Sequence, residues 1–385
     1  MRIAVITGPA PGHSFPAAAL AVALRERGHV VAVLSGPEWA SALERDGVES
    51  LDLPLLSHDF DSGDIGHRLY GRAAEMAPPC AEMLRGWRAD AVVSDTLVTC
   101  GGWAAALCDL PWVELVPHAL QDLSRDLPPP GTALSAGRTL VGRGRDAVLR
   151  RLTERSLRLA GTQRAAARRS IGLDTDAPPV LRLVATLPAL EPPRSDWPAR
   201  THIVGPLVWD PAGVDLEPPT GDAPLVFVSA STVPGRALGV LETAVAGLRD
   251  VQLVCTTLTS YDAPLPPWAR VGIGRQQPLL DVADVLVSGA GNGIVCKGLS
   301  AGLPMVLVPG WGDQKENAAR AGRLGAAVVI PPQRLTVDRL RHAVNRALNE
   351  PTMRTKSAQA GATGDGLGPS YAADLVTRTL SPSLG

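Results

Sequence analysis

The stretch from Val285 to Ile330 restricts the possible folds of this chain more than any other. Short apolar runs alternate there with segments of helical character, at 285–287, 294–300, 305–308, 315–324 and 328–330. Apolar runs separated by helices are typical of a βαβαβ unit, in which parallel strands are buried on both faces. The pattern therefore predicts an α/β domain built on a parallel sheet.

The turn after the first of these runs is rich in glycine and leads directly into a helix. It contains Gly289, Gly291, Asn292 and Gly293. Such a turn directs free backbone N–H groups and the positive end of the helix dipole at one point, where an anion such as a diphosphate binds. The sequence thus predicts anion binding at this edge of the sheet.

The next turn of the unit ends in Asp313 and Gln314. Because ligands of open α/β sheets bind outside the carboxyl ends of the strands, these side chains are expected beside the glycine turn. A carboxylate and an amide are suited to the hydroxyl groups of a sugar.

Two other interpretations of this unit stay open. A dinucleotide-binding site would require G-x-G-x-x-G, but Ile294 occupies the place of the third glycine. Alternatively, the glycines only form tight turns.

The beginning of the chain repeats the pattern, with apolar runs at 3–6, 30–34 and 49–53 and helical segments at 17–27 and 39–46. His13 lies on the loop expected between the first strand and its helix. A histidine there can act as a general base near neutral pH, or simply bond to the backbone. Asp95 follows a further buried strand at 89–93, so both side chains are expected at one sheet edge, where a carboxylate would orient the imidazole.

The chain is long enough for two domains. Prolines and glycines cluster around residues 205–224, which indicates a linker. We expect an N-terminal Rossmann-like domain at 1–207, a linker at 208–223 and a C-terminal Rossmann-like domain at 224–385. The last helix is expected to pack back on the N-terminal domain.

Charge and cysteine content exclude several classes of protein. The net charge is −1, which favours neither nucleic acid nor an anionic membrane as a partner. The five cysteines are scattered, as expected for reduced thiols in the cytoplasm. No apolar run reaches the roughly 18 residues of a membrane helix, and no metal-ligand cluster is expected.

Three segments carry a resemblance to a known family, and together they span nearly the whole chain. They are PGHSFPAAALAVALRERGHVV, HIVGPL and SGAGNGIVCKGLSAGLPMVLVPGWGDQKENAARAGRLGAAVVI. The chain resembles the GT-B glycosyltransferases, and more narrowly the bacterial natural-product branch of family 1. The resemblance implies two facing α/β domains with a cleft between them. It also implies inverting, metal-independent transfer of a sugar, without a cofactor, from a nucleotide diphosphate to a small aglycone.

The resemblance also assigns roles to residues. It makes His13 the base and Asp95 the acid that orients it. Donor-binding residues would be Ser231, Thr232, Arg275, Gln276, Gln277, Gly289, Gly291, Asn292, Gly293, Asp313 and Gln314, with the segment 275–277 holding the nucleobase through its backbone. Acceptor-binding residues would be Phe60, His67 and His118. The family usually has a histidine at the start of the glycine turn, where this chain has Gly289.

The resemblance further suggests a deoxysugar on dTDP as donor, a polyketide-like aglycone, an O- or C-glycoside product, and a monomer or homodimer. Two other functions stay open. One is a nucleotide-sugar epimerase of the same fold, and the other is a non-catalytic accessory protein of a partner glycosyltransferase.

Overall fold

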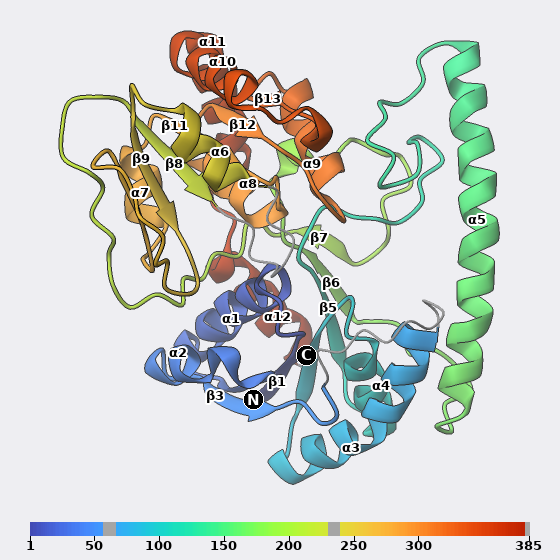
Figure 1. Ribbon diagram of the computed structural model, residues 1–385. Coiled ribbons are helices and arrows are strands. Elements are labelled where there is room, and N and C mark those ends of the chain that lie inside the picture. Colours follow the sequence, from blue (N-terminus) through green and yellow to red (C-terminus); the bar gives the residue numbers. More distant parts are fainter. Residues whose placement is uncertain (57–66, 230–238, 382–385) are drawn as a thin grey trace.

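The computed structural model describes residues 1–56, 67–229 and 239–381, and its strands form two separate parallel sheets (Figure 1). The first sheet has the order β3-β2-β1-β4-β5-β6-β7 and the second the order β10-β9-β8-β11-β12-β13. All neighbouring strands in both sheets pair in parallel. The prediction of a two-domain α/β fold is confirmed.

The strands of the first sheet are β1 (Arg2–Ile6), β2 (Val30–Ser35), β3 (Glu49–Asp52), β4 (Ala91–Asp95), β5 (Trp112–Val116), β6 (Leu181–Val184) and β7 (Thr201–Ile203). Those of the second are β8 (Leu225–Ser229), β9 (Gln252–Thr256), β10 (Ala269–Gly272), β11 (Val285–Ser288), β12 (Met305–Leu307) and β13 (Ala327–Val329).

The helices of the N-terminal unit are α1 (Pro11–Glu26), α2 (Ala40–Arg45), α3 (Arg72–Trp87), α4 (Thr99–Leu107) and the long, mostly exposed α5 (Leu140–Arg169). The C-terminal unit contains α6 (Val240–Gly247), α7 (Gln277–Val282), α8 (Asn292–Ser300), α9 (Gln314–Arg323), α10 (Val337–Asn349) and α11 (Pro351–Gly361). The last helix is α12 (Pro369–Leu380).

Each sheet changes its winding direction at one point. In the first sheet the chain moves outward from β1 to β3 and then returns to place β4 on the other side of β1. In the second sheet the same change occurs between β8 and β11. Loops leave such a switch point in opposite directions, which opens a crevice at the carboxyl ends of the two strands. A ligand site is therefore expected at each of these points.

The last helix crosses back to the N-terminal unit. Ala372, Ala373 and Val376 of α12 are fully buried in the same core as Leu20 of α1. Arg27, which follows α1, forms an ion pair with Asp374 at 2.5 Å. The N-terminal core is thus completed by the end of the chain.

The linker also makes specific contacts with both units. Trp209 packs edge-to-face on Phe15 of α1, with ring centroids 5.5 Å apart, and its indole N–H donates to Asp46. Asp210 accepts from the backbone N–H of Gln276 in the C-terminal unit, and Asp215 accepts from the guanidinium of Arg275. Within the described residues, no helix is long and apolar enough to cross a membrane.

Replacing Val376 with aspartate is expected to lower the free energy of unfolding by about 3 kcal/mol or more, because the substitution places an unpaired charge in the N-terminal core. Urea unfolding followed by tryptophan fluorescence measures the change. Arg378→Ala, at an exposed position of the same helix, should change the free energy by less than about 0.5 kcal/mol. An unchanged midpoint for Val376→Asp would contradict the packing of α12 on α1.

Candidate active site

His13 and Asp95 meet at the switch point of the first sheet. Ile6 of β1 pairs with Ser94 of β4, so Asp95 lies at the edge from which the chain enters α1. Nδ1 of His13 donates to Oδ2 of Asp95 at 2.8 Å. The other carboxylate oxygen accepts from the backbone N–H of Leu97 at 2.8 Å. The expected proximity of the two side chains is therefore present.

The helix begins earlier than the sequence suggested, because α1 starts at Pro11 rather than near residue 17. Pro11 fits a first helical position, where no N–H bond is lost. His13 consequently lies in the first turn of α1 and not on a loop. Its backbone position is fixed by a hydrogen bond from its N–H to the carbonyl of Ala10.

The surroundings of His13 favour its protonated form. Burial lowers the pKa of the imidazole, but the hydrogen bond and charge of Asp95, together with the weaker attraction of Asp313, raise it above its ordinary value overall. The Asp95 side chain is fully buried, whereas that of His13 is 22% exposed. Because Nδ1 is bonded to Asp95, Nε2 is the nitrogen that can take a proton from a substrate.

The glycine turn lies at the switch point of the second sheet, between β11 and α8. Ala290 has a φ of 65°, so an alanine rather than a glycine occupies the left-handed conformation of this turn. Side-chain atoms added at Gly291 and Gly293 would enter open space. The first N–H groups of α8 have no partner within the helix, so this open region is bordered by free donors.

Asn292 differs from its expected role because its side chain faces the other unit. Its amide nitrogen donates to the carbonyls of Pro117 at 3.1 Å and Ala185 at 2.9 Å. Its amide oxygen accepts from the hydroxyl of Thr186 at 3.0 Å. All three bonds are buried and join the two units. The side chain therefore cannot donate to a diphosphate, and only the backbone N–H of Asn292 remains for that role.

Asp313 and Gln314 lie at the start of α9, beside the glycine turn. The oxygen of the Gln314 amide accepts from the backbone N–H of Gly310 at 2.7 Å. Oδ2 of Asp313 accepts from Asn317 at 2.9 Å, and Asn317 also donates to the carbonyl of Ala290. Asn317 thus joins the two turns. Within the described residues, the second oxygen of Asp313 and the amide nitrogen of Gln314 make no hydrogen bond and can meet sugar hydroxyls.

The segment expected to hold the nucleobase is anchored to the linker. The guanidinium of Arg275 pairs with Asp215 at 2.5 Å, and its backbone N–H donates to Val214. The backbone N–H of Gln276 donates to Asp210 at 2.7 Å. These two backbone donors are therefore occupied, and the carbonyl of Gln276 accepts from the backbone N–H groups of Leu279 and Leu280. The side chain of Gln277 donates to Asp281 within α7.

Of the residues expected to bind the acceptor, only His118 can be placed with its side chain. It follows β5, is half-buried, and donates from Nδ1 to the carbonyl of Ala119 at 2.9 Å. Phe60 lies outside the described residues, as do Ser231 and Thr232 of the donor set. His67 begins the short helix η2 (His67–Gly71), and its side chain lies outside the description.

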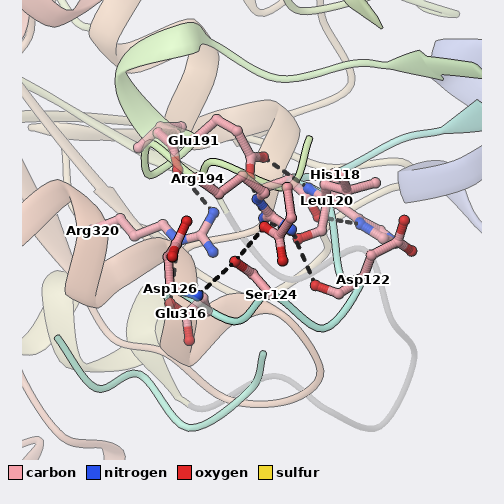
Figure 2. Close-up of polar contacts among 12 residues, drawn as sticks. His118, Leu120, Asp122, Ser124, Asp126, Glu191, Arg194, Glu316 and Arg320 are labelled. Carbon is pink, nitrogen blue, oxygen red and sulfur yellow. Dashed lines mark hydrogen bonds and ion pairs between the residues drawn. The ribbon is translucent and has the colours of Figure 1, made fainter. Parts of the chain in front are cut away.

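A buried charge cluster fixes the loop after β5 near α9, as Figure 2 shows. Glu191 and Arg194 form an ion pair at 2.8 Å, and both side chains are 2% exposed. Glu191 also accepts from the backbone N–H of Leu120 at 2.8 Å. Burial raises the pKa of Glu191, although the nearby charges of Arg320 and Arg194 oppose the increase.

The helix α9 is connected to this cluster from the other unit. Arg320 donates to the carbonyl of Leu190 at 2.8 Å and pairs with Glu316 at 3.1 Å. Glu316 in turn accepts from the backbone N–H of Ala133 at 2.8 Å. These contacts hold α9, which Asp313 precedes as the N-cap residue, against the N-terminal unit. The charge of Asp313 contributes to raising the pKa of His13.

The sequence of this chain is similar to known proteins over nearly its whole length. Residues 254–365 match the sequence model described as "Erythromycin biosynthesis protein CIII-like, C-terminal domain". The chain is 29% identical over 401 residues to 4'-demethylrebeccamycin synthase of Lentzea aerocolonigenes. That alignment covers 93% of this chain and 94% of the relative. It is also 22% identical over 378 residues to NDP-glycosyltransferase YjiC of Bacillus subtilis, in an alignment that covers 93% of this chain and 92% of the relative.

Solved structures agree with these sequence matches. The glycotransferase of kitacinnamycin superimposes with a TM-score of 0.77 at 25% identity, over 99% of both chains. These similarities identify the chain as a glycosyltransferase, and they support the bacterial natural-product type. VinC, a glycosyltransferase solved in complex with dTDP, shares the fold of this glycosyltransferase with a TM-score of 0.70 at 20% identity, over 99% of both chains. The two α/β units are those of the GT-B fold.

Several residues that shape the site of this glycosyltransferase were not singled out from the sequence. Asn317 follows Asp313 by one helical turn, and this spacing alone could have identified it. Asp210 and Asp215 lie in a linker whose composition gave no sign of specific contacts. Thr186 meets Asn292 only through the tertiary fold.

Replacing Asp95 with asparagine is expected to lower the pKa of His13 below its ordinary value, because burial then acts without the carboxylate. With the folded pKa raised above the unfolded value, protonated His13 stabilises the native state at low pH. That contribution disappears as the pH rises through the folded pKa. NMR titration of the histidine side chains measures the change in the pKa of His13. Asp52→Asn, at an exposed carboxylate, is the control, and an unchanged His13 pKa in Asp95→Asn would contradict the pairing.

Replacing Asn292 with alanine is expected to reduce stability by about 3 kcal/mol, because buried carbonyl and hydroxyl groups lose their partners. Denaturant unfolding gives the value. Asn345→Ala, at an exposed helical position, should cost less than about 0.5 kcal/mol. Equal stability of the two variants would show that the amide does not join the units in solution.

Proposed function

We propose that this glycosyltransferase moves a deoxysugar from a nucleotide diphosphate, dTDP, to a small aglycone with inversion at the anomeric carbon. The observation that carries the proposal is the hydrogen-bonded pair of His13 and Asp95 at the first switch point, where the charge of Asp313 from the second unit also acts on the imidazole. A base from one unit would act on the acceptor, and a carboxylate from the other unit would bind the donor sugar. This arrangement suits a transfer between two substrates.

The proposed reaction is a single displacement. Nε2 of His13 removes the proton of the acceptor hydroxyl as its oxygen attacks the anomeric carbon. Asp95 holds the imidazole through Nδ1 and stabilises its positive form. The bond from the anomeric carbon to the diphosphate oxygen breaks, and the leaving diphosphate gains stabilisation from the N–H groups at the start of α8.

The proposed donor follows from the similarity to other glycosyltransferases. The resemblance to the natural-product branch favours a dTDP-linked deoxysugar, and VinC of the same fold was solved with dTDP. For the aglycone we propose a polyketide-like or other small polycyclic molecule, joined as an O- or C-glycoside. Resistance of the product to acid hydrolysis would identify a C-glycoside.

Replacing His13 with alanine is expected to reduce turnover by about 10²-fold or more, the usual contribution of a general base. The measurement is release of dTDP from a dTDP-sugar in the presence of an aglycone. His342→Ala, at an exposed histidine of α10, should leave turnover unchanged, and circular dichroism should show that both variants are folded. Wild-type turnover in His13→Ala would remove His13 from the mechanism.

The same assay separates the proposed transfer from the alternatives. A transferase consumes the donor productively only when an acceptor is present. Conversion of the donor sugar without any acceptor would indicate an epimerase. Purified enzyme that is active alone would exclude a purely accessory role.

A further inference from the structure

Lys297 is a cation on α8 of the C-terminal unit, outside the set of residues assigned to the site above. It lies in the second turn of α8 and is half-buried. Its ammonium donates to the side-chain oxygen of Gln276 at 2.8 Å. Among the described residues, no carboxylate lies within ion-pair distance of it, and its attraction to Asp210 is longer-ranged.

The position of Lys297 on α8 brings it to the start of the helix. It follows Gly293 by four residues, so the two share one helical face. Because helical side chains lean toward the N-terminus, the stem of Lys297 extends toward the turn that carries Gly293. An added side-chain atom at Gly293 would meet open space, so this face of the helix start is uncovered.

The partner of Lys297 places its ammonium at the second switch point. Gln276 follows β10, and its amide nitrogen donates to the hydroxyl of Thr256 at the end of β9. In the sheet, β8 lies between β9 and β11, and α8 follows β11. The contact between Lys297 and Gln276 therefore spans the carboxyl end of β8, where a ligand of such a sheet binds.

The charge of Lys297 is incompletely neutralised. Burial lowers the pKa of its ammonium, and only the distant attraction of Asp210 opposes this effect. An amide oxygen satisfies one of the three donors of an ammonium but carries no net charge. An anion at the start of α8 would supply the missing counter-charge.

The glycine turn lacks a positively charged side chain that could pair with an anion. Gly289 stands where the family usually has a histidine that donates to the diphosphate. Side-chain atoms at this position would contact the amide of Gln314 at 3.7 Å. Backbone N–H groups remain in the turn, but the turn itself provides no side-chain cation.

We propose that Lys297 is a donor-binding residue whose ammonium pairs with the diphosphate and replaces the charge that Gly289 lacks. Gln276 holds the ammonium in place when the site is empty. This inference rests on the proposed function, since it names a further residue of the same donor site. The competing explanation is that Lys297 only positions Gln276.

Binding measurements with dTDP and with thymidine separate the two explanations, because thymidine has the base and sugar but no phosphate. Lys297→Met is expected to weaken dTDP binding by about 10- to 100-fold, the loss of one charge-assisted hydrogen bond. Thymidine binding should change by less than about twofold. The salt dependence of dTDP binding should become shallower, because one ion pair is lost.

Two further variants sharpen the test. Lys297→Gln keeps a donor for Gln276 but removes the charge, so it should bind dTDP as weakly as Lys297→Met. Lys356→Met is the matched control, since the exposed Lys356 also donates to a glutamine amide, that of Gln359 at 3.4 Å. It should bind dTDP like the wild type. Thermal unfolding verifies that each variant is folded.

Three results would overturn the inference. They are wild-type dTDP affinity in Lys297→Met, equal weakening of dTDP and thymidine, and recovery of dTDP binding in Lys297→Gln. Each of these leaves the proposed function intact, provided that the wild type binds dTDP. Wild-type protein that binds neither dTDP nor UDP would overturn the proposed function together with this inference.

Discussion

The buried amide of Asn292 determines how the two units meet. Three hydrogen bonds join its amide to the N-terminal unit, and the thiol of Cys296 also donates to its oxygen at 3.8 Å, so the side chain has no donor left. Because Asn292 is also the first residue of α8, the start of that helix cannot shift without breaking buried bonds to the N-terminal unit. The helix start and the loop after β5 are therefore fixed relative to each other. Polar groups buried in this way cost free energy unless all are satisfied, so they favour one arrangement of the units.

In this arrangement the two parts of the site have opposite electrostatic potentials. The acidic side chains, Asp95 and Asp313, lie near the imidazole and favour the charge that His13 gains when it accepts a proton. The helix start contributes positive potential where a leaving group would gain negative charge. The opposite charges that develop during a displacement would thus each meet a complementary environment, and little rearrangement would be required.

The sequence predicted those features that depend on strand order and failed for those that depend on how the units are docked. His13 and Asp95 could be paired in advance, because the carboxyl ends of parallel strands meet at one edge. The bonds of Asn292 to Pro117 and Ala185 could not, because a backbone carbonyl has no signature in the sequence. The start of α1 was missed since glycine and proline near residue 10 indicate a loop as readily as a helix start. The left-handed conformation of Ala290 could not be predicted either, because the neighbouring glycines would be expected to adopt it and do not.

The return of α12 to the N-terminal unit has a consequence for how the protein is made. Its buried residues are synthesised after the whole C-terminal unit, yet they fill a core whose strands and first helix leave the ribosome early. Domains generally fold in the order of their synthesis, but here the earlier unit stays unfinished until residue 376 has emerged. Throughout translation of the second half, the apolar side of α1 lacks its cover and is open to contact with other chains. The N-terminal core can therefore reach its native packing only after the C-terminal unit has been synthesised.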